Sequence, residues 1–374
     1  MKITNGEVFD LNGGFVRRDV YTNGKYLSDK SGDNTVIDAN NCYVIPALVD
    51  IHFHGCIGED FSDADAEGLS CIAEYELSRG IAYICPAGMT LPEQQLAKIC
   101  KTAAEYENKH GAELVGINLE GPFVSAAKKG AQNEKFIHTP DIDMLNRLQT
   151  AASGKVRLVT VAPECENAIS FIKAATEYGV TVSVGHTNAD YDTASAAFAS
   201  GAKQITHMYN AMPPLHHRKP AVIGAAFDNE NVRAELICDG VHVHPSAVRA
   251  AFKLFGADRI ILISDSLRAT GMPDGDYPFG GQTITLHGSR AVMADAPDTL
   301  AGSVTNLMDC MRKAVSFGVP LADAIKTATY NPASAIGVDD RIGSLDNGKE
   351  ASMVLLDKSD LSIRGIIYKG ERIS

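Results

Sequence analysis

The sequence predicts an α/β protein: a closed (β/α)8 TIM-like barrel with a small β-sandwich domain formed by both chain termini. Three observations carry this prediction. Strand-like and helix-like segments alternate through the middle of the chain, short β-prone segments occupy both ends, and polar side chains recur where the central strands end. The 374 residues suffice for one large domain and a smaller one. We expect the barrel to span residues 46–342 and the small domain to combine residues 1–45 with 343–374.

The central alternation is typical of parallel βαβ units. Eight apolar, β-branched runs predict strands within 48–54, 80–86, 113–121, 156–164, 180–187, 203–210, 233–240 and 260–266. Amphipathic stretches that end at or near glycine predict helices within 65–80, 92–110, 167–179 and 190–201. Eight strands favour a closed barrel, although a large open sheet would give much the same pattern.

The two ends of the chain have a different pattern. Asn-Gly and Gly-Gly steps separate short β-prone runs up to about residue 45, which predicts hairpins. Near the C-terminus, residues 352–357 and 363–373 are strand-like, with Lys369 and Gly370 at a turn. Neither end alone has enough apolar surface for a core, so we expect the two ends to pair.

Composition narrows the class of function. The formal net charge of −12 argues against a general binder of nucleic acid or of anionic membranes, because both need a broad basic surface. We expect no signal peptide, and no apolar run is long enough to span a bilayer. Eight scattered cysteines without a C-x-x-C pair indicate reduced thiols, so we expect a cytoplasmic protein.

Residues able to bind a metal or carry a proton end most of the predicted strands. The first strand ends in His52 and His54, two positions apart and therefore on one face of an extended chain. The later strands supply Glu120, His186, His207, Asp239 with His242 close behind, and Asp265. In a barrel the carboxyl ends of the strands meet at one mouth, where active sites of this fold are built. We therefore expect these side chains to surround one point.

So many convergent imidazole and carboxyl groups predict a divalent metal site, because burying them without a partner is costly. Imidazole and carboxylate suit zinc, iron or manganese, and a bound ion lowers the pKa of its water toward ~7. Asp265 could take that proton and return it to a leaving group. Taken singly, each histidine could be a hydrogen-bonded residue that binds no metal, and Asp265 could be the N-cap of a helix. Cys56, beside the histidine pair, we interpret as a packed small side chain.

A second group of polar residues lies in segment 207–227, where the chain becomes Pro-rich and basic. Asn210, His216, His217, Arg218 and Lys219 make it the most cationic short stretch of an acidic protein. The segment is either a solvated loop or a clamp for an anionic group, since arginine gives phosphate or carboxylate bidentate hydrogen bonds. Its place directly after His207 favours the clamp.

Seven segments together resemble the N-acetylglucosamine-6-phosphate deacetylase branch of the amidohydrolase superfamily, from about residue 44 to the C-terminus. They are VDIHFHG, NLEGPFVSAAKKGA, VGHTNADY, THMYNAMPPLHHRKP, ELICDGVHVHP, ISDSLRATGMPDG and DTLAGS. The resemblance implies a metal-dependent hydrolase that converts N-acetylglucosamine 6-phosphate to glucosamine 6-phosphate and acetate. It also implies a homodimer and a bound divalent metal, zinc or iron, with one or two ions per subunit.

The resemblance also implies roles for individual residues. Glu120, His186 and His207 would hold the main metal, and His52 and His54 match positions that support a second ion in some members. The remaining matches are the catalytic acid/base Asp265, the amide-orienting His242, and the phosphate-binding Asn210, backbone of Ala211 and Arg218. The fourth strand offers no lysine of the carboxylated kind that other binuclear amidohydrolases use, which favours Glu120 as the bridging carboxylate.

One departure from the branch keeps a rival function open. Gln132 stands where many members have a histidine that helps contact the sugar, so the hexosamine preference can differ. The protein would then deacetylate another N-acetyl amino-sugar phosphate, such as N-acetylgalactosamine 6-phosphate, or another cyclic amide. A second rival, a non-catalytic phosphosugar-binding barrel, predicts damaged ligand or acid/base positions, and none of these positions is damaged.

Overall fold

The central part of the chain is a curled system of parallel strands. The computed structural model describes residues 1–12, 14–108 and 110–374. A seven-stranded parallel sheet has the order β12–β14–β15–β16–β17–β18–β19, and a three-stranded one the order β13–β11–β8. The strands are β8 (Leu48–Asp50), β11 (Ile81–Ile84), β12 (Ala87–Gly88), β13 (Glu113–Leu114), β14 (Ile117–Leu119), β15 (Val156–Val161), β16 (Thr181–Val184), β17 (Gln204–Ile205), β18 (Arg233–Ile237) and β19 (Ile260–Ile263).

Backbone hydrogen bonds connect the two parallel sheets at both of their junctions. On one side the amide of Asn118 donates to the carbonyl of Pro86, 3.0 Å away. On the other side the amide of Asp265, just beyond β19, donates to the carbonyl of His52, just beyond β8, at 2.9 Å. The first strand of the series therefore lies next to the last.

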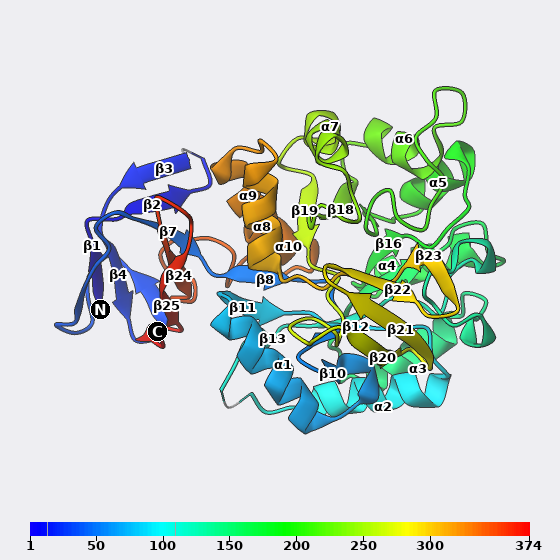
Figure 1. The fold of residues 1–374 in the computed structure, drawn as a ribbon, viewed down its shortest axis with the longest axis horizontal. Coiled ribbons are helices and arrows are strands. Elements are labelled where there is room, and N and C mark those ends of the chain that lie inside the picture. Colours follow the sequence, from blue (N-terminus) through cyan, green and yellow to red (C-terminus); the bar gives the residue numbers. More distant parts are fainter. Residues whose placement is uncertain (13, 109) are drawn as a thin grey trace.

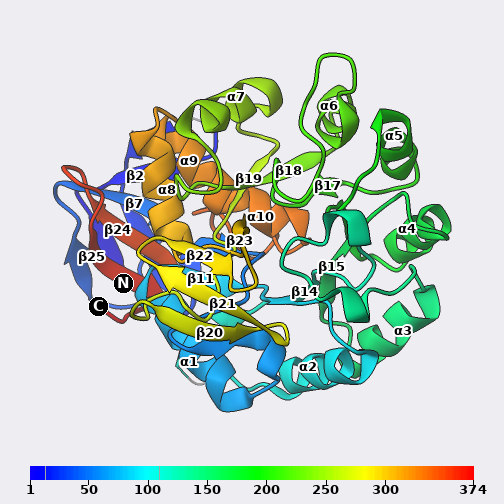
Figure 2. The ribbon, with the colours of Figure 1, turned by 45° about the vertical axis from the view of Figure 1, so that its right-hand side comes forward.

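Helices cover the outside of the strands (Figure 2). They are α1 (Ala66–Ser78), α2 (Glu93–Glu105), α3 (Ile142–Ala151), α4 (Ala168–Glu177), α5 (Tyr191–Ala199), α6 (Ala221–Asp228), α7 (Pro245–Phe255), α8 (Leu307–Ser316), α9 (Leu321–Ala328) and α10 (Tyr330–Ala335). In α1 the Asp65 carboxylate caps the first turn, and Leu69, Ile72 and Leu77 face the core at helical spacing. Within the described ranges, no helix has the length and hydrophobicity needed to cross a membrane.

Strands and helices occur in all of the predicted segments with shorter bounds, but the segment 113–121 is divided into two strands, β13 and β14, which belong to different sheets. The parallel strands are almost fully buried, which is why they appear in the sequence as continuous apolar runs rather than alternating ones.

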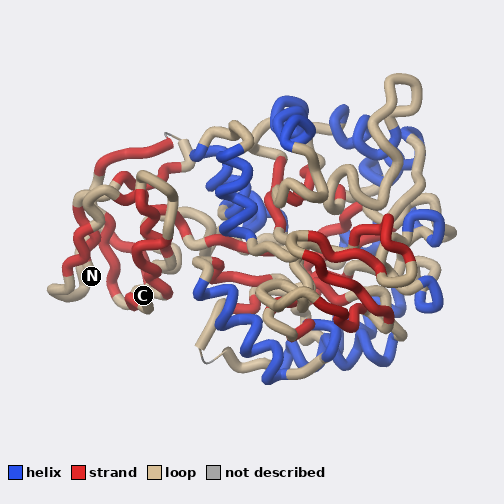
Figure 3. The backbone as a smooth tube through the Cα atoms, viewed as in Figure 1, coloured by secondary structure: helices blue, strands red, loops and turns tan. Residues whose placement is uncertain are grey.

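The two chain ends share a sheet, as predicted. One sheet has the order β26 (Glu371–Arg372), β25 (Ile363–Tyr368), β24 (Met353–Asp357), β7 (Cys42–Pro46), β2 (Glu7–Asp10) and β3 (Gly14–Arg17). A second contains β5 (Tyr26–Ser28), β4 (Val20–Asn23), β1 (Lys2–Thr4) and β6 (Val36–Asp38). Ile3, Val44 and Met353 belong to one buried cluster separate from the main core. These strands form a helix-free body to one side, with both termini in it (Figures 1 and 3).

An antiparallel four-stranded sheet that we did not expect lies across the parallel strands (Figure 1). It consists of β20 (Gly275–Phe279), β21 (Gln282–His287), β22 (Arg290–Met293) and β23 (Ala296–Leu300). Phe279 and Ile284 join a third buried cluster with Met89 and Leu267, so the sheet is anchored by its own apolar face. It brings residues 298–302 to the cavity described below.

Candidate metal centre and active site

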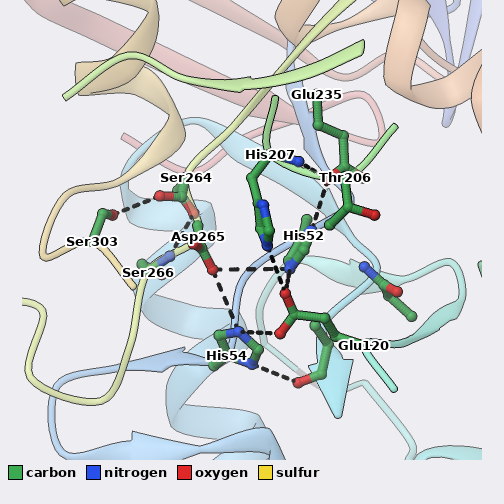
Figure 4. Close-up of polar contacts among 12 residues, drawn as sticks. His52, His54, Glu120, Thr206, His207, Glu235, Ser264, Asp265, Ser266 and Ser303 are labelled. Atoms are coloured by element: carbon green, nitrogen blue, oxygen red, sulfur yellow. Dashed lines mark hydrogen bonds and ion pairs between the residues drawn. The ribbon is translucent and has the colours of Figure 1, made fainter. Parts of the chain in front are cut away.

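Six of the predicted site residues meet at the carboxyl ends of the parallel strands. Figure 4 shows His52, His54, Glu120, His207 and Asp265 among them. Two groups of possible metal ligands form there, each with its ligand atoms within 4.8 Å of one another. One comprises Glu120, His186 and His207, and the other His52, His54 and Asp265. All six side chains are buried.

The carboxylate of Glu120, which follows β14, lies between the two groups. Its Oε1 atom is 3.0 Å from both His186 Nε2 and His207 Nε2, and 3.2 Å from His52 Nε2. Its Oε2 atom is 3.2 Å from His54 Nε2. Asp265 Oδ1 completes the second group at 3.4 Å from His54 Nε2. Oε1 thus faces His186, His207 and His52, and Oε2 faces His54, so the carboxylate contacts both groups and could bridge two cations.

Three of the four histidine rings are oriented by hydrogen bonds on their outer nitrogens, whereas His207 Nδ1 is buried without a partner among the described residues. The Nδ1 atoms of His54 and His186 face the carbonyls of Ala87 and Lys128 at 3.1 and 3.0 Å. Because a carbonyl only accepts, each Nδ1 carries the proton, and in a neutral ring Nε2 presents a lone pair to the centre. His52 is held likewise, by a 2.8 Å contact from Nδ1 to Glu235.

This donor set fits a divalent metal. His186 Nε2 and His207 Nε2 are only 3.1 Å apart, and His52 Nε2 is buried without a hydrogen-bond partner. Lone pairs and carboxylate oxygens that face one another need a cation between them. Ligand atoms about 2.0–2.2 Å from one tetrahedral zinc ion lie roughly 3.3–3.6 Å apart, slightly more than the spacing here.

Without an ion, protons must supply the positive charge. Burial lowers the pKa of His54, but contacts with Asp265 and Glu120 outweigh burial and raise that pKa to about 10. Burial raises the pKa of Glu120, yet His52 and His186 hold it well below its ordinary value. The centre therefore attracts cations strongly, and protons and metal ions would compete for it.

The backbone at this centre is unusual. His186, His207 and Asp265 have φ values of 45°, 29° and 50°, in the left-handed region that side-chain-bearing residues rarely adopt. Each such residue costs on the order of 1–3 kcal/mol and persists only where the surroundings impose it. The turn after each strand redirects the chain so that the side chain faces the centre.

A cavity of about 260 Å³ adjoins the metal ligands. Among the other predicted site residues, Gln132, Asn210, Ala211 and His242 line it. Further lining residues, to which our sequence analysis assigned no role, are Met89, Gly130, Ala131, Phe279, Asp298, Thr299, Leu300, Ala301 and Gly302. Apolar alternation and the Gly280–Gly281 turn could have revealed the antiparallel sheet that carries several of them.

His242 is fixed at the cavity wall by two acceptors. Its Nδ1 lies 2.7 Å from Asp239 Oδ2, and its Nε2 lies 3.0 Å from the carbonyl of Ala301. Burial lowers the pKa of His242, but the contact with Asp239 outweighs burial and raises it above its ordinary value. A ring with acceptors on both sides is favoured in its protonated, donating form.

Gln132 is turned toward the metal ligands. Its Nε2 donates to Glu120 Oε2 at 2.6 Å, and its Oε1 accepts from the amide of Thr90 at 2.7 Å. The side chain is buried, and both ends of its amide are engaged within the protein. Besides lining the cavity, Gln132 therefore orients the carboxylate that faces both ligand groups.

Arg218 is not brought to this cavity. The segment from Pro214 to Lys219 is exposed, and Arg218 Nη1 lies 2.7 Å from His217 Nε2. Neither Arg218 nor its two histidine neighbours line the cavity. The chain turns outward after Met212, so of the residues predicted for the phosphate clamp only Asn210 and Ala211 lie at the cavity.

Glu235 is a further residue at the metal centre to which the sequence analysis assigned no role. It is fully buried in β18, and its Oε2 accepts from the amide of His207 at 3.1 Å as well as contacting His52 (Figure 4). Its Oε1 accepts from the side-chain Nε2 of Gln204 at 2.6 Å. A glutamate inside an apolar strand was the available signal, because a buried carboxylate needs a partner.

A curled parallel sheet whose carboxyl ends hold two histidine and carboxylate groups is an architecture suited to metal-dependent hydrolysis. The chain belongs to the amidohydrolase family, whose sequence profile matches residues 43–373.

Individual proteins that are similar to this chain have more specific activities than the family as a whole. The chain is 36% identical over 333 residues to an N-acetylglucosamine-6-phosphate deacetylase of Bacillus subtilis, covering 87% of this chain and 83% of the relative. It is 36% identical over 332 residues to an N-acetylgalactosamine-6-phosphate deacetylase of Escherichia coli O157:H7, covering 88% and 87%. The crystal structure of N-acetyl-D-glucosamine-6-phosphate deacetylase from Mycobacterium smegmatis superposes with a TM-score of 0.91 at 30% identity, covering 100% of both chains.

Proposed function

We propose that the protein is a metal-dependent deacetylase that hydrolyses the N-acetyl group of N-acetylglucosamine 6-phosphate, giving glucosamine 6-phosphate and acetate. The observation that carries the proposal is the meeting of Glu120, His186 and His207 within 3.1 Å beside a cavity. The relatives named as deacetylases of 6-phosphorylated N-acetylhexosamines supply the substrate class.

The metal would be held by the residues already described. Glu120, His186 and His207 form the main site, and His52, His54 and Asp265 form a second, so one or two ions per subunit fit. Zinc or iron suits this mixture of imidazole and carboxylate. When bound, such an ion makes water a nucleophile at neutral pH and polarises the acetyl carbonyl.

The protein's own side chains would then position the amide and move protons. Asp265, beside His54 and at the cavity, takes a proton from the attacking water and delivers it to the departing amine. His242 releases its Nε2 hydrogen bond from the carbonyl of Ala301 and donates to the developing oxyanion. Asn210 and the backbone of Ala211 bind the phosphate, which orients the reacting end of the substrate.

We further propose that the parallel strands close into an eight-stranded barrel spanning residues 46–342. The hydrogen bond from Asp265 to His52 supports closure. Residues 1–45 and 343–374 would form a flanking β-sandwich, supported by the cluster shared by their two sheets. The homodimer and the cytoplasmic location remain predictions from the sequence.

A deacetylase of N-acetylgalactosamine 6-phosphate is the second candidate. The relative from Escherichia coli O157:H7 is as similar as the relative from Bacillus subtilis, 36% identical in each case. Gln132 adds weight, because it occupies the cavity position where many members of this branch have a sugar-contacting histidine.

One experiment tests the function and separates the candidates. Elemental analysis of the purified protein is combined with acetate release from both epimeric 6-phosphates and from unphosphorylated N-acetylglucosamine. We expect bound metal, with kcat/KM highest for N-acetylglucosamine 6-phosphate. Preference for the galactosamine epimer would select the second candidate, and metal-loaded protein without acetate release from any substrate would refute both.

A further inference from the structure

A second cavity lies at the opposite end of the parallel strands. Its volume is about 670 Å³, compared with about 260 Å³ beside the metal ligands. Its walls include Thr181 and Gln204, the first residues of β16 and β17, and the end of α10. A strand rises about 3.3 Å per residue, so Thr181 and His186 are separated by roughly 15 Å. We call this space the basal cavity.

Among the charged residues that line the basal cavity, cations outnumber acids. Arg157, Lys203, Arg233 and Arg259 face two acids, Glu230 and Asp258. Asp258 already pairs with Lys326, outside the lining. In the described part of the chain, no carboxylate oxygen lies within 4.0 Å of the charged groups of Arg157, Lys203 or Arg233. Three uncompensated cations at one place are unexpected in a protein with a net charge of −12.

The stem of the Arg157 side chain packs against Gly116. A methyl group at Gly116 would lie 2.4 Å from Arg157 Cγ, so the absence of a side chain there makes room for the arginine stem. Arg157 Nε is shielded from solvent and has no hydrogen-bond partner. Gln204 Oε1, on the same cavity, is also buried and unpartnered. Polar atoms left in this state cost free energy unless something binds to them.

Arg233 is partly occupied but still lacks a counter-charge. Its Nη2 donates to Ser334 Oγ at 3.1 Å, and burial lowers its pKa from the ordinary value. A guanidinium group stays protonated in proteins, so the charge persists. Arg157 is the second residue of β15 and Arg233 the first of β18, with Lys203 just before β17 between them in the sheet order. The cations are thus distributed around the cavity wall.

We propose that the basal cavity binds a small phosphorylated anion of about sugar-phosphate size. Guanidinium groups bind phosphate through paired, charge-assisted hydrogen bonds, and a lysine adds a mobile charge. The volume lies within the range of small-molecule sites, roughly 300–1,000 Å³. The site goes beyond the proposed function, because it is separate from the cavity that would hold the substrate. Its lining residue Gln204 is connected through Glu235 to His52 by contacts of 2.6 and 2.8 Å.

The test measures binding of inorganic phosphate to metal-loaded protein by calorimetry, with the site located in crystals grown with phosphate. Arg157→Met and Arg233→Met each remove a charge but keep an apolar stem, and Lys98→Met removes an exposed charge on α2 as the matched control. We expect phosphate density between Arg157 and Arg233. We also expect a site that the two arginine variants weaken at least 10-fold and Lys98→Met leaves unchanged.

Two results would overturn the proposal: binding that is the same in the parent and both arginine variants, or crystals with phosphate only beside the metal ligands. If Arg157→Met does not fold, Lys203→Met makes the same test at an exposed position, with the same 10-fold expectation.

Discussion

Replacing Asp265 with asparagine tests the proposed acid/base directly. The surroundings of Asp265 are well suited to this change. Its amide donates to the carbonyl of His52 at 2.9 Å, and its carbonyl accepts from the amide of Ser303 at 2.7 Å. Both contacts involve the backbone and survive the substitution. The shape of the side chain is also kept, so the change is confined to one oxygen and its charge.

The expected loss follows from what that oxygen does. A positioned general acid/base contributes about 10²- to 10⁴-fold to rate, or about 3–5 kcal/mol of activation free energy. Asp265 Oδ1 is 3.4 Å from His54 Nε2 and 3.9 Å from His52 Nε2, whereas Glu120, His186 and His207 make their close contacts with one another. The main metal group therefore remains intact, and kcat should fall by about 10²- to 10⁴-fold while the ion at Glu120, His186 and His207 stays bound.

The assay is acetate release at saturating N-acetylglucosamine 6-phosphate, with metal content measured on the same sample. Asp295→Asn serves as the matched control, because Asp295 is an exposed aspartate outside the cavity lining. The control should behave like the parent. If Asp265→Asn keeps its metal and turns over within about threefold of the parent, Asp265 is not the acid/base.

Three further changes follow from the structure. Gln132→Ala removes the 2.6 Å contact to Glu120, so metal affinity in competition with a chelator should fall about 10- to 100-fold; a raised KM at unchanged affinity would instead make Gln132 a sugar contact. Arg218 is exposed and lies outside the cavity, so Arg218→Ala should change KM for the phosphorylated sugar no more than the neighbouring exposed Lys219→Ala does; a rise in KM confined to Arg218→Ala and to the phosphorylated sugar would restore the clamp. Glu76 is fully buried without a hydrogen bond of normal geometry, and burial raises its pKa well above 4.5, so the folded protein keeps a proton that the unfolded chain loses. Its contribution to the free energy of unfolding therefore falls as pH rises through that interval. In urea unfolding, the stability of Glu76→Gln relative to the parent should therefore increase as pH rises above the ordinary range of a glutamate, and a pH-independent difference would contradict the assignment.

The sequence predicted the parts of this protein whose physics is local or periodic. Continuous apolar runs between amphipathic stretches identified the parallel strands and four of the helices, because strands buried on both faces need no polar alternation. Metal-type residues at the ends of those runs identified the centre, because parallel strands bring their carboxyl ends together. Both inferences were possible without knowing any distance between side chains in the folded protein.

What the sequence could not predict depends on where side chains turn after the strands. The left-handed backbone of His186 and His207 and the contact of Gln132 with Glu120 arise from tertiary packing. The position of Arg218 also could not be predicted from the sequence. This residue follows the sixth strand closely in sequence, yet its loop turns outward and leaves it exposed. Proximity along the chain placed Asn210 at the cavity but not a residue eight positions later.

The pairing of β7 with β24 has a consequence for how the chain is made. Pro46 lies opposite Met353 in this antiparallel pair, so β7 leaves the ribosome about 300 residues before its partner exists. At 5–20 residues per second the wait is roughly 15–60 s. Until then β7 has an open edge, which is prone to pair with other chains. The open edge of β7 is thus covered only when the last strands have been translated. A chain released before residue 350 would be prone to aggregation although it carries every proposed metal ligand.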